Sequence, residues 1–361
     1  MTSTDLPPTR GASDAGPRTT GPAPGAVEAT GDATAEATGE ATADTSGVAA
    51  APPRDGARRR LPTTSLVPRP GARRVDDGLV HLALPKGRMQ TGVLALLAEA
   101  GITVRLDERG YRPVLSVPGF ETKLLKPQDL VTMLGAGSRD LGFAGADWVA
   151  ERGLDLVELL DTGLDPVRLV AAAPEELVED GRLPRRALRV ASEYAGLTTA
   201  WMQRTLAGGT FVKSSGATEV YPPEDADVIV DNTATGATLR ANGLVIVEEL
   251  MRSSTRLYAS PAALEDPERR GRIEDLVLCL EAVLEARGRA MIELNVGADR
   301  LEAVVAALPC MREPTVAGLY GQGGFAVRAA VPRGDLPRLV PDLKARGATD
   351  IVVSRCEQIV P

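Results

Sequence analysis

The chain contains very few of the side chains on which many enzymes rely for acid–base chemistry. Histidine occurs once, as His81, and aromatic residues make up only 3% of the sequence. One imidazole cannot form a multi-histidine metal site, and His81 lies in the alternating run Val-His-Leu-Ala-Leu, which predicts a β-strand. We therefore interpret His81 as a structural residue and expect no chemistry that depends on a histidine base.

Cysteine and long apolar runs are also scarce. The three cysteines are an odd number without a close pair, so the sequence predicts neither a disulfide framework nor a metal knuckle. No uninterrupted apolar run is long enough to cross a bilayer, and the N-terminus lacks the basic-then-apolar order of a secretory signal. We expect a cytoplasmic protein without membrane contact.

The net charge of −8 argues against a general nucleic-acid binder, although local basic clusters could hold a polyanionic nucleotide. Residues 1–77 differ from the rest, because they contain no aromatic residue and repeat short units such as Ala-Thr-Gly-Asp. Such a segment cannot bury enough apolar surface to offset the entropy of ordering it. The sequence therefore predicts a disordered low-complexity tail over 1–77.

From residue 79 onward, apolar runs alternate with amphipathic segments. Predicted strands and helices of a first unit follow one another at 79–84, 92–100, 114–117, 123–125, 128–134, 141–144 and 147–152. Those of a second unit lie at 167–173, 188–191, 198–206, 211–213 and 226–231, and the run 248–259 returns to the first unit. This alternation predicts an α/β protein with a mostly parallel sheet, two lobes and ligands at the carboxyl ends of strands.

The last part of the chain has another rhythm. After a predicted helix at 272–287, strands and helices are predicted at 291–296, 299–308, 315–319, 325–331, 336–346 and 351–354. The resulting order, β-α-β-β-α-β, is that of a ferredoxin-like fold.

The segment 226–239 says most about function, because an apolar strand runs directly into a hydroxyl- and glycine-rich turn that opens a helix. Thr235, Gly236, Ala237 and Thr238 lie where backbone N–H groups at a helix start would lack partners, which suits a phosphate monoester. Asp231 would repel the phosphate, but it could accept hydrogen bonds from sugar hydroxyls. The pattern predicts a phosphorylated-ribose site, although helix capping explains the same residue types.

The same segment closely resembles the phosphoribosyl-diphosphate loop of ATP phosphoribosyltransferases. The resemblance extends, in the family's order, to the motifs Leu-Ala-Leu-Pro-Lys-Gly-Arg-Met at 82–89, Asp-Leu-Gly-Phe-Ala-Gly-Ala-Asp-Trp at 140–148, Ser-Gly-Ala-Thr-Glu at 215–219 and Arg-Gly-Arg-Ala-Met-Ile-Glu-Leu-Asn at 287–295. It implies a catalytic core similar to type II periplasmic binding proteins, with lobe I at 78–170 and 255–286 and lobe II at 171–254. A regulatory ferredoxin-like domain that senses histidine is implied at 287–361.

The resemblance also implies the reaction and its partners. In this family N1 of the ATP adenine displaces diphosphate from C1′ of 5-phosphoribosyl 1-diphosphate, with Mg²⁺ present, as the first step of histidine biosynthesis. The leaving group is good and the nucleophile is neutral, so positioning and charge neutralisation dominate and histidine is not needed. No residue cluster is typical of a dedicated Mg²⁺ site, so we expect the metal to arrive with the diphosphate. Inhibition by L-histidine and a homo-hexamer follow from the resemblance alone.

Three basic residues are candidates for handling phosphate. Arg88 and Lys86 lie in Pro-Lys-Gly-Arg, between a predicted strand and helix, where Gly87 lets the backbone approach a ligand. The resemblance implies a catalytic role for Arg88 and a weaker, substrate-binding role for Lys86; a solvated surface turn is the alternative. Lys126 stands where many relatives have an arginine that assists diphosphate departure, and lysine keeps the charge but loses the two-pronged geometry.

The other substrate-binding candidates also come from the resemblance. Asp147 is placed against the nucleotide, but it could instead cap the short helix that follows. Glu219 is placed at the nucleotide and ribose side, with charge complementarity at a helix start as the alternative. Asp231 is implied to bind the ribose hydroxyls, and residues 235–238 the 5′-phosphate.

In the last unit, Glu313, Thr315 and the glycine-rich loop 321–324 could border a histidine pocket, although a plain hairpin explains the glycines. Two other functions stay open. One is a two-lobed small-molecule binding protein, against which the missing export signal argues. The other is a relative that transfers phosphoribose to a different base or has lost activity, for which Lys126 is the supporting feature.

Overall fold

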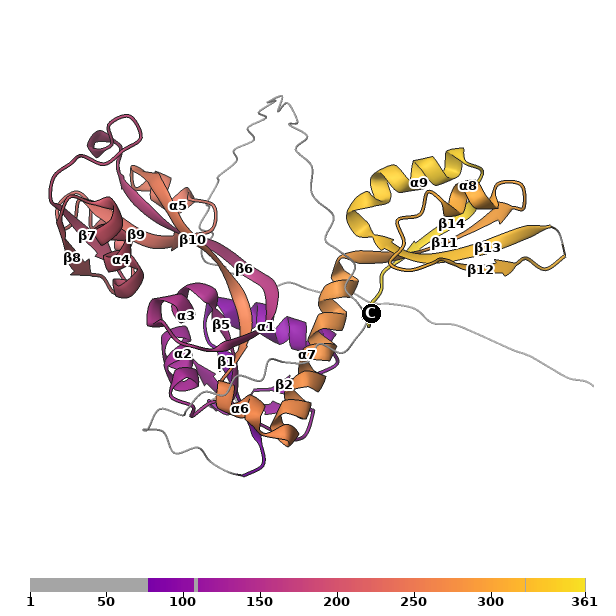
Figure 1. Cartoon of the computed structure of the whole chain (residues 1–361), viewed down its shortest axis with the longest axis horizontal. Coiled ribbons are helices and arrows are strands. Elements are labelled where there is room, and N and C mark those ends of the chain that lie inside the picture. Colours follow the sequence, from indigo (N-terminus) through magenta and orange to yellow (C-terminus); the bar gives the residue numbers. More distant parts are fainter. Residues whose placement is uncertain (1–76, 107–109, 322, 361) are drawn as a thin grey trace, which may run out of the picture. The chain divides into compact units, whose positions relative to one another are not determined.

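A computed structural model describes residues 77–106, 110–321 and 323–360 of the chain (Figure 1). The disorder predicted for residues 1–77 falls outside this range, apart from Asp77. Within the described residues, no helix is both long and apolar enough to cross a membrane.

Lobe I is built on three parallel strands, which lie in the order β4 (Phe120–Leu125), β1 (Val80–Pro85) and β5 (Leu141–Gly145). Helices α1 (Arg88–Glu99), α2 (Pro127–Gly135) and α3 (Ala146–Arg152) directly follow β1, β4 and β5. All residues of β1 are buried, as expected for a central strand covered on both faces. Helices α6 (Pro261–Glu265) and α7 (Pro267–Arg287) and the short pair β2 (Val104–Arg105) and β3 (Val114–Leu115) complete this lobe.

Lobe II repeats this plan with the parallel strands β9 (Val228–Thr233), β7 (Leu188–Ser192) and β8 (Gly209–Lys213). Helix α4 (Ala195–Thr205) follows β7, and α5 (Ala237–Ala241) follows β9. The short 3₁₀ helices η1 (Glu175–Leu177) and η2 (Thr218–Val220) lie in its connections. Trp201 of α4 is 1% exposed and anchors the apolar core of this lobe.

Two long strands join the lobes, β6 (Val157–Pro174) and β10 (Leu244–Ala259) (Figure 1). Both strands are longer than the usual strand of a globular protein. At roughly 3.3 Å per residue, each is long enough to extend through both lobes. They pair antiparallel with each other, β10 pairs antiparallel with β5, and β6 does so with β9, which gives one eight-stranded sheet. The prediction of a mostly parallel sheet is therefore right within each lobe and wrong at the centre, because a chain that crosses and returns must run in both directions.

The C-terminal domain has the predicted β-α-β-β-α-β order. Its elements are β11 (Arg289–Gly297), α8 (Leu301–Val305), β12 (Thr315–Gly318), β13 (Gly324–Pro332), η3 (Arg333–Asp335), α9 (Leu336–Ala345) and β14 (Thr349–Ser354). The strands form an antiparallel sheet in the order β12-β13-β11-β14, around its own apolar core. This confirms the ferredoxin-like fold. The predicted residue limits of the lobes and of this domain stay predictions, since β6 and β10 belong to both lobes.

Candidate active site

The carboxyl ends of the parallel strands carry the predicted site residues. In lobe I, Lys86 follows β1, Lys126 follows β4, and Asp147 lies just after β5. In lobe II, the loop after β8 leads to Glu219, and residues 235–238 follow β9. Open α/β sheets bind ligands at this edge, because the loops there converge and their helix starts expose N–H groups.

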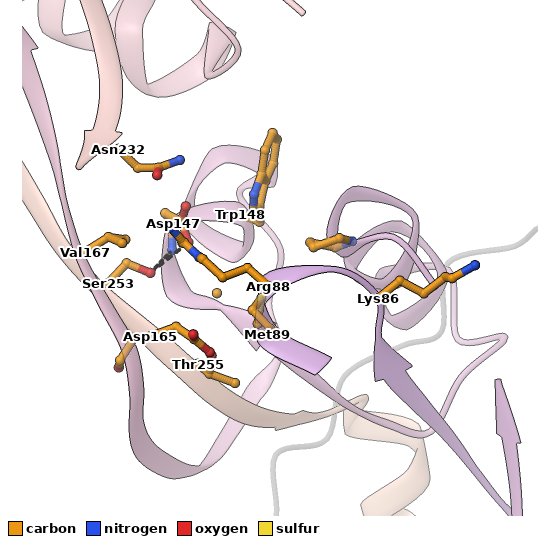
Figure 2. Close-up of a pocket in the computed structure, with 13 residues that line it drawn as sticks. Lys86, Arg88, Met89, Asp147, Trp148, Asp165, Val167, Asn232, Ser253 and Thr255 are labelled. Carbon is orange, nitrogen blue, oxygen red and sulfur yellow. Dashed lines mark hydrogen bonds between the residues drawn. The ribbon is translucent and has the colours of Figure 1, made fainter. Parts of the chain in front are cut away.

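A cavity of about 150 Å³ brings part of this set together (Figure 2). Lys86, Arg88 and Asp147 line it from lobe I, and Asn232, directly after Asp231, lines it from lobe II. Lys126 is not among the lining residues, although its neighbour Pro127 is; neither are Glu219, Asp231 and residues 235–238. The cavity thus contains the lobe I candidates Lys86, Arg88 and Asp147, whereas the lobe II candidates lie outside its lining.

Arg88 and Lys86 point in different directions. Arg88 is the first residue of α1, after Gly87 with a φ of 83°, and its side chain extends toward Asp147 across the cavity (Figure 2). Lys86 points away from the other labelled residues, and its ammonium lies 4.1 Å from the ring centroid of Tyr111. A cation held on an aromatic face is attracted by the ring quadrupole. Arg88 is therefore better placed than Lys86 to meet a phosphate in the cavity.

Lys126 occupies the N-cap position of α2, with an extended backbone (ψ 148°) and a proline next in the helix. Its side chain is exposed. The ammonium and the positive end of the α2 dipole therefore act in the same direction on an anion near this helix start.

Asp147 does not cap α3, so that alternative is wrong. Asp147 is 5% exposed, and α3 has no side-chain cap. Instead, Oδ1 accepts a 2.7 Å hydrogen bond from the hydroxyl of Ser253 on β10, and Oδ2 accepts a 2.6 Å bond from the hydroxyl of Tyr194 in lobe II. A buried carboxylate needs such donors, and here they come from two distant segments of the chain.

Asp231, on β9, stands in an acidic environment. Burial, followed by the charges of Glu219 and Glu193, raises its pKa to about 6, although the Asn232 N–H donates to Oδ1 at 2.7 Å. Such a carboxylate gains from any ligand that brings hydroxyl donors or positive charge. Perturbed groups of this kind are frequent at functional sites.

The loop after β9 is arranged around its threonines. Gly236 has a φ of 76°, its N–H donates to Oγ1 of Thr233 at 2.9 Å, and the N–H of Ala237 donates to Oγ1 of Thr235 at 3.3 Å. Two N–H groups expected to lack partners are thus held by hydroxyl groups of the loop itself. The side chains of Thr235 and Thr238 are exposed, so the surface of the loop is open to a ligand.

Several residues of this site are not among the site residues that the sequence predicts. Trp148 and Tyr194 stack with ring centroids 4.7 Å apart and an interplanar angle of 28°. Trp148, Asp165 and residues 253–255 of β10 also line the cavity. Aromatic residues just beyond strand ends, in a chain so poor in them, were the available signal. The hydroxyl groups of residues 253–255 gave no signal in the sequence, since they reach the site only because β10 returns from lobe II to lobe I.

No group of three or more His, Cys, Asp or Glu side chains in the described residues is arranged to hold a metal ion.

Together, the fold and these residues define a two-lobed α/β protein whose loops are suited to phosphorylated ligands. Comparison with known proteins identifies the family. The ATP phosphoribosyltransferase family model matches residues 126–282, and the model of that family's C-terminal domain matches residues 286–358. The chain belongs to the ATP phosphoribosyltransferase family.

Two relatives illustrate the match. The chain is 33% identical over 281 residues to the ATP phosphoribosyltransferase of Chlorobaculum parvum. The aligned region covers 76% of this chain and 96% of the relative. It is 36% identical over 286 residues to that of Natronomonas pharaonis, covering 78% of this chain and all of the relative (100%). A solved structure, the ATP phosphoribosyl transferase (HisG:HisZ) complex from Thermotoga maritima, superposes with a TM-score of 0.50 at 24% identity, over 56% of this chain and 99% of that one. The structural likeness supports the fold of the core.

Proposed function

We propose that the residues at the carboxyl ends of the strands carry out the reaction of this family in the following way. The activity is that of an ATP phosphoribosyltransferase, the first step of histidine biosynthesis: ATP and 5-phosphoribosyl 1-diphosphate give N1-(5-phosphoribosyl)-ATP and diphosphate. Asp231 accepts hydrogen bonds from the ribose hydroxyls. The loop formed by Thr235, Gly236, Ala237 and Thr238 surrounds the 5′-phosphate.

One observation carries this assignment. Asn232 lines the cavity that Arg88 and Asp147 line from the other lobe, and it directly follows Asp231. A ribose held by Asp231 would therefore sit beside a nucleotide in the cavity. Such proximity is the main requirement of a displacement between two bound substrates.

The basic residues have distinct proposed roles. Arg88 and Lys126 act on the phosphates as catalytic residues, with Lys86 as a secondary contact, and they stabilise the negative charge that grows on the leaving diphosphate. Asp147 and Glu219 contact the nucleotide and the ribose side. The family acts with a divalent metal ion, which we propose to be Mg²⁺ brought by the diphosphate; when bound, it neutralises phosphate charge.

Regulation is proposed for the C-terminal domain. L-histidine would bind near Glu313 and Thr315, whose side chains lie just before and at the start of β12. The glycine-rich loop lines a cavity of about 490 Å³ in the same domain, through Gly323 and Gly324, but Glu313 and Thr315 do not. A homo-hexamer in the cytoplasm completes the proposal.

The reaction is tested by mixing the protein with ATP, 5-phosphoribosyl 1-diphosphate and Mg²⁺ and following the near-ultraviolet absorbance of the product. Product must appear only when all three are present. Replacing Asp231 and Thr238 should remove most of the turnover. Full turnover in that variant would refute the assigned sugar site, and no turnover in the unaltered protein would favour a binding protein or a different acceptor base.

A further inference from the structure

Helix α3 of lobe I is docked on the first turn of α4 in lobe II. Glu151 of α3 accepts two backbone hydrogen bonds, from the N–H of Gly196 to Oε1 at 3.0 Å and from the N–H of Leu197 to Oε2 at 2.9 Å. The side chain of Tyr194, the N-cap residue of α4, does not perform this task. The free N–H groups of a helix start need acceptors, and here the acceptor comes from the other lobe.

Tyr194 makes a second contact between the lobes. Its side chain is completely buried (0% exposed), its hydroxyl donates to Asp147 Oδ2 at 2.6 Å, and its ring stacks on Trp148. The backbone of Tyr194 is fixed as well, because its N–H donates to the hydroxyl of Ser192, which in turn donates to the carbonyl of Val230 at 2.6 Å. The ring is thereby placed relative to β9, the strand that carries Asp231.

Asn232 connects these contacts to the sugar site. Its side-chain N–H donates to the hydroxyl oxygen of Tyr194 at 2.8 Å. Burial, and then the charge of Asp147, hold the pKa of the Tyr194 phenol far above its usual range, so the hydroxyl keeps its proton. One hydroxyl hydrogen can serve only one acceptor. The chain of donors therefore runs in one direction, from Asn232 to Tyr194 to Asp147.

We propose that Glu151, Asp147, Trp148, Tyr194 and Asn232 form an interlobe latch, and that Asn232 is the positioning residue through which the latch orients the neighbouring Asp231. The proposal rests on the proposed function, in which Asp231 holds the ribose and the cavity beside Asp147 holds the nucleotide. The latch makes each substrate site depend on the other lobe.

The latch holds the lobes together because their separation would leave polar groups without hydrogen-bond partners. Two N–H groups of α4, a buried carboxylate and a buried phenol would lose partners, and each unsatisfied buried group carries a desolvation cost. The lobes are otherwise joined by β6 and β10, whose pairing has register shifts beside Ser253. A nucleotide that contacts Asp147 and Trp148 would stabilise the latched arrangement, and the latched arrangement holds Asp231 in place. Binding of the two substrates is then coupled, in both directions.

Calorimetry with an unreactive nucleotide tests this coupling. 1-Deaza-ATP has a C–H in place of the nucleophilic N1, so it can occupy the nucleotide site without reacting. In the unaltered protein with Mg²⁺, we expect saturating 1-deaza-ATP to tighten the binding of 5-phosphoribosyl 1-diphosphate at least about fivefold. In Asn232→Leu this ratio should fall to within about twofold of one, because the apolar side chain keeps the size of asparagine and loses the donor. A ratio unchanged by Asn232→Leu overturns the proposal.

A double-variant cycle separates positioning from plain loss of stability. Tyr194→Phe keeps the stacked ring and loses the hydroxyl, so it should reduce the binding ratio as Asn232→Leu does, and the double variant should lose no more. Independent effects that add would show that Asn232 does not act through Tyr194. Glu151→Gln should also reduce the ratio, whereas the matched control Glu265→Gln, on α6, should not. If the unaltered protein binds no 5-phosphoribosyl 1-diphosphate at all, the proposed function fails, which is a different result from binding without coupling.

Discussion

The carboxylates of Asp231 and Glu219 repel each other, and this repulsion adds to burial in raising the pKa of Asp231 to about 6. The ordinary value is 3.8. Near pH 6 and without bound substrate, Asp231 is therefore present in both its charged and its neutral form. This is the carboxylate that we assign to the ribose hydroxyls.

Activity should depend on the charge of Asp231. We expect kcat/KM for 5-phosphoribosyl 1-diphosphate to fall about tenfold per unit as pH drops below about 6, because kcat/KM reports groups of the free enzyme. The phosphate of the substrate titrates in the same range. Asp231→Asn is therefore needed as a comparison: its kcat/KM should be about 100-fold lower at about pH 8, with a shallower fall on acidification. A pH profile identical in both proteins would contradict the assignment.

Stability should change in the opposite sense to activity at the same residue. Because its pKa is raised, Asp231 holds a proton more tightly in the folded chain than in the unfolded chain. The contribution of Asp231 to the free energy of unfolding therefore decreases as pH rises from about 4 to about 6, and it stays low at higher pH. We expect Asp231→Asn to raise Tm at about pH 8 and to have a smaller effect at about pH 5. Thermal unfolding at the two pH values measures this, and a variant that is less stable at the higher pH would be inconsistent with it.

Gly236 should be essential for the phosphate loop. Its φ is 76°, and a Cβ there would lie 3.1 Å from Nη1 of Arg240, so Gly236→Ala combines backbone strain with a close contact. We expect KM for 5-phosphoribosyl 1-diphosphate to rise at least about tenfold with little change in KM for ATP. Gly243 is the matched control, since it has a φ of 69° and a Cβ added there would meet nothing within 4 Å. Equal kinetic effects in both variants would mean that strain alone, rather than the phosphate site, is responsible.

Lys126 should act mainly through its charge. We expect Lys126→Met to lower kcat about 100-fold, because a cation near the leaving diphosphate stabilises charge that grows in the transition state. Lys126→Arg should keep activity within about threefold, since arginine retains the charge and adds a second donor. Arg105→Met, on β2, serves as a control for a general loss of positive charge. Steady-state kinetics would contradict the role if Lys126→Met were as active as that control.

The position of the histidine site can be tested within the C-terminal domain. We expect Thr315→Val to raise the L-histidine concentration that gives half inhibition at least about fivefold without changing kcat, because it removes a hydroxyl from the proposed site. Thr349 lines the cavity of this domain, so Thr349→Val is the informative comparison. Weakened inhibition by Thr349→Val alone would move the histidine site from β12 to that cavity.

Arg139 should matter for stability and not for catalysis. It is 5% exposed, forms an ion pair with Glu121 and approaches Nδ1 of His81 at 3.2 Å, next to the amino ends of the lobe I strands. We expect Arg139→Leu to cost about 2 kcal/mol of unfolding free energy and to leave both KM values unchanged, since it removes the buried partner of Glu121 and leaves only an exposed arginine beside that carboxylate. Arg112 pairs with the same Glu121 at 2.8 Å, but its side chain is 69% exposed, so Arg112→Leu should cost less than about 1 kcal/mol. Denaturant unfolding would refute this if the two costs were equal.

The alternation of apolar runs was sufficient to predict the lobes and the ferredoxin-like domain, but not the full length of the crossing strands. The predicted strand at 167–173 is the second half of β6 (Val157–Pro174). Its first half contains Asp161, Gly163 and Asp165, which are typical of a turn. Gly163 has a φ of 65° and Asp165 a φ of 47°, and the register with β10 shifts at this point. Pairing with β10 holds these residues in the sheet, and single-sequence patterns contain no information on that pairing.

The site likewise contains some residues that local sequence patterns indicate and some contacts that they do not. Residues such as Arg88 and Asp231 are set by local strand-turn-helix patterns, so the sequence indicated them. The partners of Asp147 are 47 positions away, at Tyr194, and 106 positions away, at Ser253. Contacts over such separations depend on the crossover of the chain, and for this reason Asp147 was open to interpretation as a helix cap.

Pro174 at the end of β6 and Leu244 at the start of β10 are paired neighbours in the sheet. The intervening segment therefore leaves and re-enters the protein at one place, like a domain inserted into a host. A tight turn joining the two positions would bridge the gap without stretching the remaining sheet. Lobe I with its C-terminal domain could thus be prepared as a shortened protein, in which Asp147 and Trp148 lack their partner Tyr194 and the dependence of nucleotide binding on lobe II can be measured directly.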